Sequence, residues 1–224
     1  LASAMVLTKY LSEALEGQWQ VGMLNAPSSA PATCCYALWC TPCMTYNQRL
    51  ELLDITQEKY MCCAGLCNCC CFGSPCDSHF PWLCLEVCFC SSQAIVANRF
   101  MLQTRFDRKN DACDNCLMIT AGCCDLVASI SNNSGGGQDP DARWIMDVFY
   151  ASVCACMLTQ QAVELEHIKK ELESKPYSGV PEHIMNCFGS AAAPAQLVMH
   201  SGSENASYGA AVPAGAPVIQ GVRV

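Results

Sequence analysis

Four apolar runs dominate the middle of the chain, at residues 61–76, 80–98, 115–130 and 148–163. A transmembrane helix needs about 20 consecutive apolar residues, and each run is shortened or interrupted by Gly, Pro or a charge. The run at 80–98 comes closest, because Glu86 is its only charge and basic residues follow it, as at the cytoplasmic end of a span. The pattern predicts helices that lie in or on a membrane and leaves their topology open.

The clearest helix predicted by the sequence is the last long one. Asp139 and Pro140 supply a cap followed by proline at the first helical position. The helix is expected to run to about Ser174, because Pro176 cannot continue it. Its first half is apolar and its second half is charged, so we expect it to pass from a buried environment into water.

Polar and small residues outside these runs predict arms and connections. Residues 3–16 have apolar positions at helical spacing, and 25–33 hold two prolines among small residues, which favours a linker. The glycine-rich stretch 131–138 predicts a flexible loop, and the Ala/Gly/Pro-rich tail an extended segment. The chain thus divides into an N-terminal arm, a cysteine-rich domain and an extended tail, at residues 1–16, 17–174 and 175–224.

The composition narrows the possible functions. Charged residues make up 14% of the chain, against roughly 25% in an average soluble domain. Twelve basic and 20 acidic residues give a net charge of −8, which argues against nucleic-acid partners and against a polybasic membrane anchor. His79 lies near Cys76 and Asp77, but nothing orients the histidine and no oxyanion loop is recognisable, so we expect no enzyme.

Cysteine is the most unusual component, with 21 residues, 18 of them between Cys34 and Cys124. Three interpretations remain open: packed or acylated thiols, metal ligands, and a disulfide framework. The odd number argues against a complete framework of disulfides. The C-x2-C spacing of metal sites is found in Cys40 with Cys43 and, about 70 residues later, in Cys113 with Cys116.

Five segments, taken in order, carry a resemblance to a known family. They are Gly17–Gly22 (GQWQVG), Pro42–Asp54 (PCMTYNQRLELLD), Arg99–Phe106 (RFMLQTRF), Cys113–Leu117 (CDNCL) and Cys156–Leu165 (CMLTQQAVEL). Together they resemble the placenta-specific-gene-8 motif family, which includes plant cadmium-resistance and cell-number-regulator proteins. The match covers roughly residues 17–170, with an insertion at about 117–147. Departures include Asn47 in place of a usual glycine, and Thr41 and Thr159 in place of usual cysteines.

The resemblance implies a small, cysteine-rich, membrane-associated protein without a defined catalytic mechanism. Four positions match family cysteines and are the predicted ligands of a structural metal ion, zinc, namely Cys43, Cys113, Cys116 and Cys156. The alternative is that these thiols are packed between helices. Family members associate with themselves and are tied to heavy-metal tolerance, ion transport and control of proliferation.

Three acidic residues are candidates for a membrane or ion path, because ionisable groups inside a membrane are functional by default: Glu51, Glu86 and Asp125. For Glu51 the alternative is an interhelical ion pair with Arg99 or Arg105.

We therefore predict a mainly α, cysteine-rich, membrane-associated helical domain with extended N- and C-terminal segments. The expected function is the handling or sensing of heavy-metal or divalent ions by a homo-oligomer. The alternative is an accessory structural subunit docked on a larger membrane protein complex. The resemblance implies the plasma membrane; an organellar membrane is the alternative if a targeting segment ahead of Leu1 has been removed.

Overall fold

The computed structural model describes residues 14–66, 79–133 and 140–188, and it confirms the mainly α prediction. Within these residues there is no strand, and an isolated bridge joins Gln18 and Lys109. The elements are α2 (Ala26–Ser29), α3 (Pro31–Trp39), α4 (Thr41–Thr56), the 3₁₀ turn η1 (Cys62–Gly65), α5 (Trp82–Phe89), α6 (Ser91–Phe106), α7 (Ala112–Asn133), α8 (Pro140–Ser174) and α9 (Glu182–Phe188).

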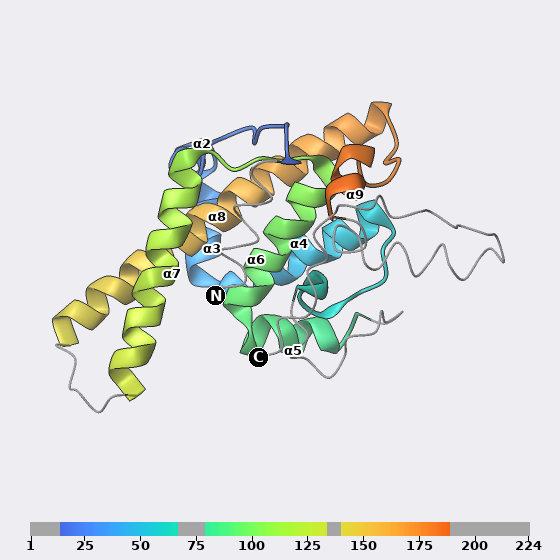
Figure 1. Ribbon diagram of the computed structural model, residues 1–224. Helices are drawn as coiled ribbons and strands as arrows, with labels where there is room; N and C mark the ends of the chain where they lie inside the picture. The colour runs from blue at the N-terminus through green and yellow to red at the C-terminus, as the bar shows by residue number, and fades with distance from the viewer. Residues whose placement is uncertain (1–13, 67–78, 134–139, 189–224) are drawn as a thin grey trace.

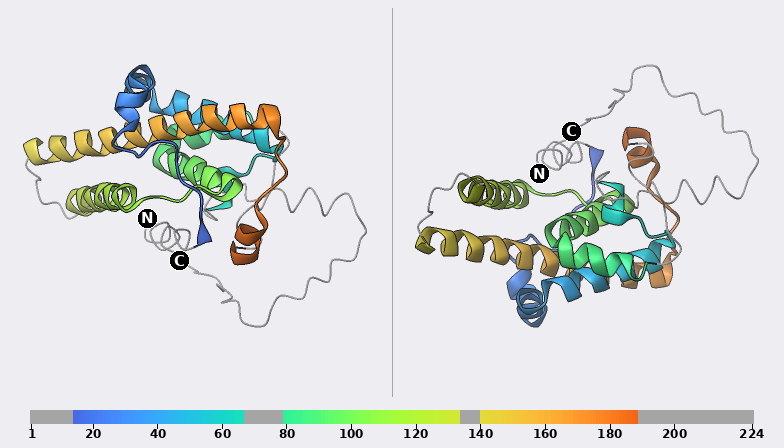
Figure 2. Two further views of the ribbon diagram at one scale, coloured as in Figure 1. Left: turned by 90° about the horizontal axis from the view of Figure 1, so that it is seen from above. Right: turned by 90° about the horizontal axis from the view of Figure 1, so that it is seen from below.

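Helix α8 organises the bundle, because it packs against α2, α3, α4, α6 and α7 along its length. Its N-terminal half and the C-terminal half of α7 project together beyond the other helices (Figures 1 and 2). We call this projection, residues 119–133 and 140–148, the hairpin tip. One hydrophobic cluster joins η1 with α4, α5 and α6, and a second joins the middle of α8 with α3, α4 and α7.

The predicted linker over 25–33 is wrong, since α2 and most of α3's first turn occupy it. Pro27, Pro31 and Pro42 each stand at the first or second position of a helix. Proline is tolerated there because the missing N–H has no partner inside the helix in any case. Proline and small residues therefore mark helix starts in this part of the chain.

The run at 80–98 is not one helix. Cys90 ends α5 and is the N-cap of α6, in a non-helical conformation with φ −127° and ψ 40°. The two serines that follow favour helix starts over helix interiors. The best single candidate span of the sequence is thus divided into two helices, and the buried arginines of α6 turn toward the bundle interior.

Helix α8 ends at Ser174 as predicted, and it begins at Pro140. Its Asp141–Ser174 part is the one stretch of the described chain that is long and apolar enough to cross a membrane, and a third of its most apolar window is buried. Helix α7 continues to Asn133, so residues 131–133 of the predicted loop over 131–138 are helical, and residues 134–138 lie outside the described residues. Helix α9 lies in the tail that was expected to be extended. Residues 1–13 and 189–224, which hold most of the predicted arm and tail, are outside the described residues.

Candidate metal site

The structure does not bring the four predicted zinc ligands together. Cys43 forms a disulfide with Cys40, so its sulfur is not a free thiolate. Cys113 and Cys116 are exposed at the start of α7, and Cys156 is half-buried in α8 beside the second hydrophobic cluster.

The reason lies between the two α7 cysteines, where Asp114 points inward and is 1% exposed. Because Asp114 is fixed to the core, its two cysteine neighbours on the helix face outward. The four cysteines therefore do not form one metal site in this structure.

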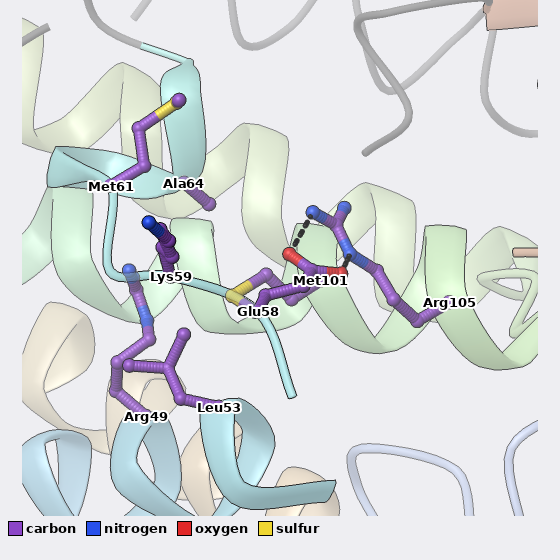
Figure 3. A pocket seen from close by; sticks show the side chains of 8 residues that line it. All are labelled: Arg49, Leu53, Glu58, Lys59, Met61, Ala64, Met101 and Arg105. Carbon is purple, nitrogen blue, oxygen red and sulfur yellow. Dashed lines mark hydrogen bonds and ion pairs between the residues drawn. The ribbon is translucent and has the colours of Figure 1, made fainter. Parts of the chain in front are cut away.

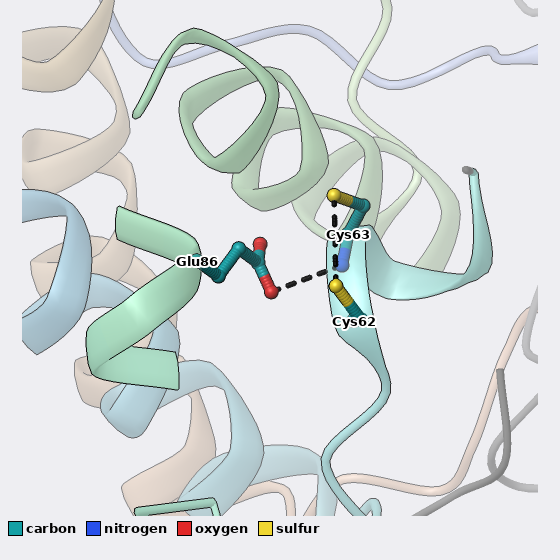
Figure 4. Close-up of side chains that lie close together, drawn as sticks. All are labelled: Cys62, Cys63 and Glu86. Carbon is teal, nitrogen blue, oxygen red and sulfur yellow. Dashed lines mark hydrogen bonds between the residues drawn. The ribbon is translucent and has the colours of Figure 1, made fainter. Parts of the chain in front are cut away.

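A different group could hold a metal ion, and it is the one such group of three or more Cys, His, Asp or Glu within the described residues. It consists of Cys62, Cys63 and Glu86, all buried, whose ligand atoms lie within 4.8 Å of one another. Figure 4 shows the two thiols of η1 facing the carboxylate, which comes from α5. The two sulfurs are 4.0 Å apart.

An unusual turn presents these thiols. Cys63 and Ala64 adopt left-handed backbone conformations with φ 50° and 51°, and Gly65 follows with φ 78°. Left-handed backbone costs a residue other than glycine about 1–2 kcal/mol, so the surroundings must hold the turn in place. The Cys63 N–H donates to Glu86 Oε2 at 3.0 Å, which ties the turn directly to the carboxylate.

Glu86 is held from three directions. Arg49 Nη2 lies 3.2 Å from Oε1, and the Tyr60 hydroxyl donates to Oε2 at 2.7 Å. The side chains of Arg49 and Glu86 are each 1% exposed, so this is a fully buried ion pair. Burial, followed by the neighbouring Glu86 charge, raises the pKa of Tyr60 well above its usual range. Tyr60 therefore keeps its proton and stays a hydrogen-bond donor to the carboxylate.

The donor set suits a soft divalent ion. Two thiolate ligands about 2.3 Å from a tetrahedral zinc ion stand roughly 3.8 Å apart, close to the observed separation. Cys62 and Cys63 as thiolates, with Glu86, carry three negative charges, and Arg49 with a divalent cation carries three positive ones. Burying a cluster of charges has a large desolvation cost unless the charges balance, and a bound dication would balance these.

A cavity of about 10 Å³ lies beside this cluster and is lined by Arg49, Lys59, Met61 and Ala64, among others. Figure 3 shows that the Glu58–Arg105 ion pair forms its other side, and both contacts of that pair measure 2.9 Å. Such a volume accommodates about one water molecule. No organic ligand fits here, which leaves an ion or water as the possible occupants.

Four of the five resembling segments meet around Arg99 in the structure. Its guanidinium stacks over Trp19 at 4.4 Å, contacts Asp114 at 3.1 Å and donates to Gln160 at 2.7 Å. Burial lowers the pKa of Arg99 to about 10, against the opposing effect of Asp114. These motif residues therefore build the buried interior of the fold.

The acidic candidates take different places. Glu51 pairs with Lys169 at 2.9 Å on the surface, and its side chain is 42% exposed. The expected pairing of Glu51 with Arg99 or Arg105 is wrong, since those arginines bind Asp114 and Glu58. Glu86 is buried in the candidate metal site, and the side chain of Asp125 in α7 lies outside the description.

Compared with known proteins, the chain matches no protein-family model, no curated protein and no solved structure. The family resemblance therefore stays a prediction. Sequence reasoning missed Cys62 and Cys63, although an adjacent cysteine pair before a glycine, with one lone glutamate in the next apolar run, was a usable signal.

Proposed function

We propose that this protein is a non-catalytic, membrane-associated helical protein that binds one soft divalent metal ion, of the zinc or cadmium class, at Cys62, Cys63 and Glu86. The observation that carries the proposal is the meeting of two buried thiols with a buried carboxylate within 4.8 Å. Thiolates select soft ions over magnesium and calcium, and the single carboxylate completes a mixed sulfur–oxygen set.

Binding at this site is expected to be coupled to protons and to local folding. Both thiols must lose their protons before they coordinate, so affinity should rise with pH through the thiol range. The bound ion takes the place of the protons on the Cys62 and Cys63 thiols, and it then links the left-handed turn to Glu86. Metal binding in such a protein makes η1 more ordered. This change in structure, and not a catalysed reaction, is how the protein handles or senses metal ions.

Membrane association is supported by where apolar and charged side chains lie. The most exposed large apolar residues are Trp39, Phe89 and Trp144, which are 91%, 81% and 67% exposed to solvent. In contrast, Arg49 and Arg99 are among the largest fully buried side chains. Soluble proteins rarely bury charges fully or expose contiguous apolar surface. Inside a membrane the opposite arrangement is favoured, because charges must face inward and pair.

The experiment is a titration of the full-length reduced chain, in mild detergent, with Cd²⁺ followed by the ultraviolet cadmium–thiolate absorption. We expect one tightly bound ion for the wild type and loss of that ion in the variant Cys62→Ser/Cys63→Ser. The matched control is Cys113→Ser/Cys116→Ser, which also removes two thiols and is expected to keep the tight site.

X-ray absorption on the wild-type complex makes the test independent of any variant. We expect two sulfur ligands and at least one oxygen ligand on the tightly bound ion. A spectrum with four sulfurs, or a tight site lost only in the Cys113/Cys116 variant, would overturn the proposal.

A second candidate function is that of an accessory subunit docked on a larger membrane protein complex. The specific observation in its favour is apolar exposure away from the hairpin tip, at Trp39 on α3 and Phe89 on α5. Co-purification of the detergent-extracted chain with unrelated proteins in fixed ratio, in place of self-association, supports this alternative.

A further inference from the structure

The Cys40–Cys43 disulfide stands at the start of α4 and plays no part in the proposed metal site. We propose that it is a thiol–disulfide exchange centre, whose co-substrates are low-molecular-weight thiols and their disulfides. The sequence Cys-Thr-Pro-Cys places two cysteines at the spacing used by dithiol oxidoreductases. The inference is independent of metal binding at Cys62 and Cys63.

Access to the disulfide is the first requirement, and the surface provides it. Cys43 is exposed and Cys40 is partly exposed, in contrast to Cys62 and Cys63, which are 8% and 2% exposed. A dissolved thiolate can therefore reach the Cys43 sulfur without opening the bundle.

A stabilised leaving group is the second requirement. Cys40 is both the C-cap residue of α3 and the N-cap residue of α4, and its side chain makes no capping hydrogen bond at α4. The N-terminal end of a helix carries partial positive charge and unpaired N–H groups, which favour a thiolate at the N-cap. Pro42 has no N–H, so the Cys43 N–H at the third helical position is the donor that an N-cap side chain normally uses.

The exchange reaction balances in two steps. A thiolate RS⁻ attacks Cys43 Sγ and forms an RS–S bond, while the Cys40–Cys43 bond breaks and its electron pair leaves on Cys40. A second thiolate then attacks the R sulfur of the mixed disulfide, which releases RSSR and the Cys43 thiolate. The protein disulfide is reduced by two electrons, two thiols are oxidised, and their two protons pass to water or to the new protein thiols.

The Cys113–Cys116 pair shows that spacing alone does not produce this centre. Both residues are exposed, at the same spacing and near the start of a helix, yet both are free thiols. Cys113 lies inside the helix, whereas Cys40 precedes its helix with φ −138° and ψ 66°. The non-helical backbone at Cys40 is therefore the feature that distinguishes the two pairs, and it makes Cys113–Cys116 a matched internal control.

The test equilibrates the native full chain, in mild detergent with a chelator, against glutathione buffers of increasing oxidation. Free thiols are then alkylated, and the peptides that hold each pair are quantified by mass spectrometry. We expect Cys40 and Cys43 to change together from two alkylated thiols to a disulfide, with a two-electron dependence on the glutathione ratio. Cys113 and Cys116 are expected to stay fully alkylated as thiols over the same buffers.

A variant tests the direction of attack. Cys40→Ser leaves Cys43 without its partner, so oxidised glutathione is expected to accumulate on Cys43 as a stable mixed disulfide. In the wild type this adduct should be lost as Cys40 displaces it. The proposal is overturned if the native disulfide resists millimolar glutathione until the chain is unfolded, or if Cys40 and Cys43 are oxidised independently of each other. Because a chelator is present throughout, neither outcome depends on the metal site.

Discussion

The bundle interior and the hairpin tip have opposite chemistry. The interior holds four arginine ion pairs, Arg49–Glu86, Arg99–Asp114, Arg105–Glu58 and Arg108–Glu164. The hairpin tip exposes Ile119, Leu126, Val127, Ile130, Trp144, Ile145 and Val148. The described part of the chain thus places many of its charges in internal pairs and exposes large apolar side chains at the hairpin tip.

The two regions therefore contribute differently to the stability of the fold. Replacing a buried ion pair by apolar residues is often neutral, whereas removing one partner leaves an unpaired buried charge. The interior pairs therefore specify how the helices meet more than they add net stability. We expect the exposed apolar side chains of the hairpin tip to contribute little to stability, because they are not buried in the bundle.

The largest effect is expected from breaking one interior pair. Asp114→Ala leaves the Arg99 guanidinium buried without a carboxylate, and removes the acceptor of the Met23 N–H at 3.0 Å. The expected loss is about 3–5 kcal/mol of unfolding free energy. Chemical denaturation in mild detergent, followed by circular dichroism, measures it; a loss below about 1 kcal/mol would show that the interior tolerates an unpaired arginine.

The next effect concerns the hairpin tip. Trp144→Ser/Ile145→Ser removes two side chains that are 67% and 60% exposed, so stability should change by no more than about 0.5 kcal/mol. Each large apolar side chain contributes about 1.5–3 kcal/mol when fully buried, so binding to neutral lipid vesicles should weaken at least roughly tenfold.

Vesicle flotation measures this binding, and Phe89→Ser on α5 is the matched control, since Phe89 is also highly exposed but outside the hairpin tip. Equal loss in both variants would show that the lipid contact is not confined to the hairpin tip.

The pH dependence of stability tests the hydrogen bond from the Tyr60 hydroxyl to Glu86. Tyr60 has a raised pKa in the folded chain, because of burial and then Glu86, while the unfolded chain ionises near pH 10. Above about pH 10 the folded state binds the extra proton, so stability falls with rising pH by about 1.4 kcal/mol per unit.

Tyr60→Phe removes that dependence, at a cost of about 1–3 kcal/mol at neutral pH for the lost donor to Glu86. Denaturant midpoints between pH 8 and 11 compare the two chains. Parallel curves would contradict the assignment of Tyr60 as a buried donor.

The smallest effect is expected at the surface. Glu51→Gln breaks the pair with Lys169, whose side chains are 42% and 46% exposed. Exposed pairs contribute about 0–1 kcal/mol, and salt screens them. The same denaturation assay should show a change within that range which disappears at high salt, in contrast to the Asp114 variant.

Parts of the fold could be predicted because the signal was local. The end of α8 at Ser174 follows from Pro176, and the helical runs follow from apolar periodicity. The break at Cys90 and the helices at 25–33 were missed, because proline and small residues start helices as readily as they form linkers. The partner of each arginine could not be predicted, since it depends on helices separated by tens of residues.

The helical class, the low charge and the high cysteine content of the chain follow from the sequence alone, because composition and the periodicity of apolar residues are local properties. The tertiary structure decided which cysteines meet. Adjacent Cys62 and Cys63 face Glu86 only because a left-handed turn and α5 pack together, while Cys113 and Cys116 face outward because Asp114 binds Arg99. The sequence specifies which side chains are present. Their burial and their proximity, which a site requires, arise only when helices that are distant in the sequence pack together.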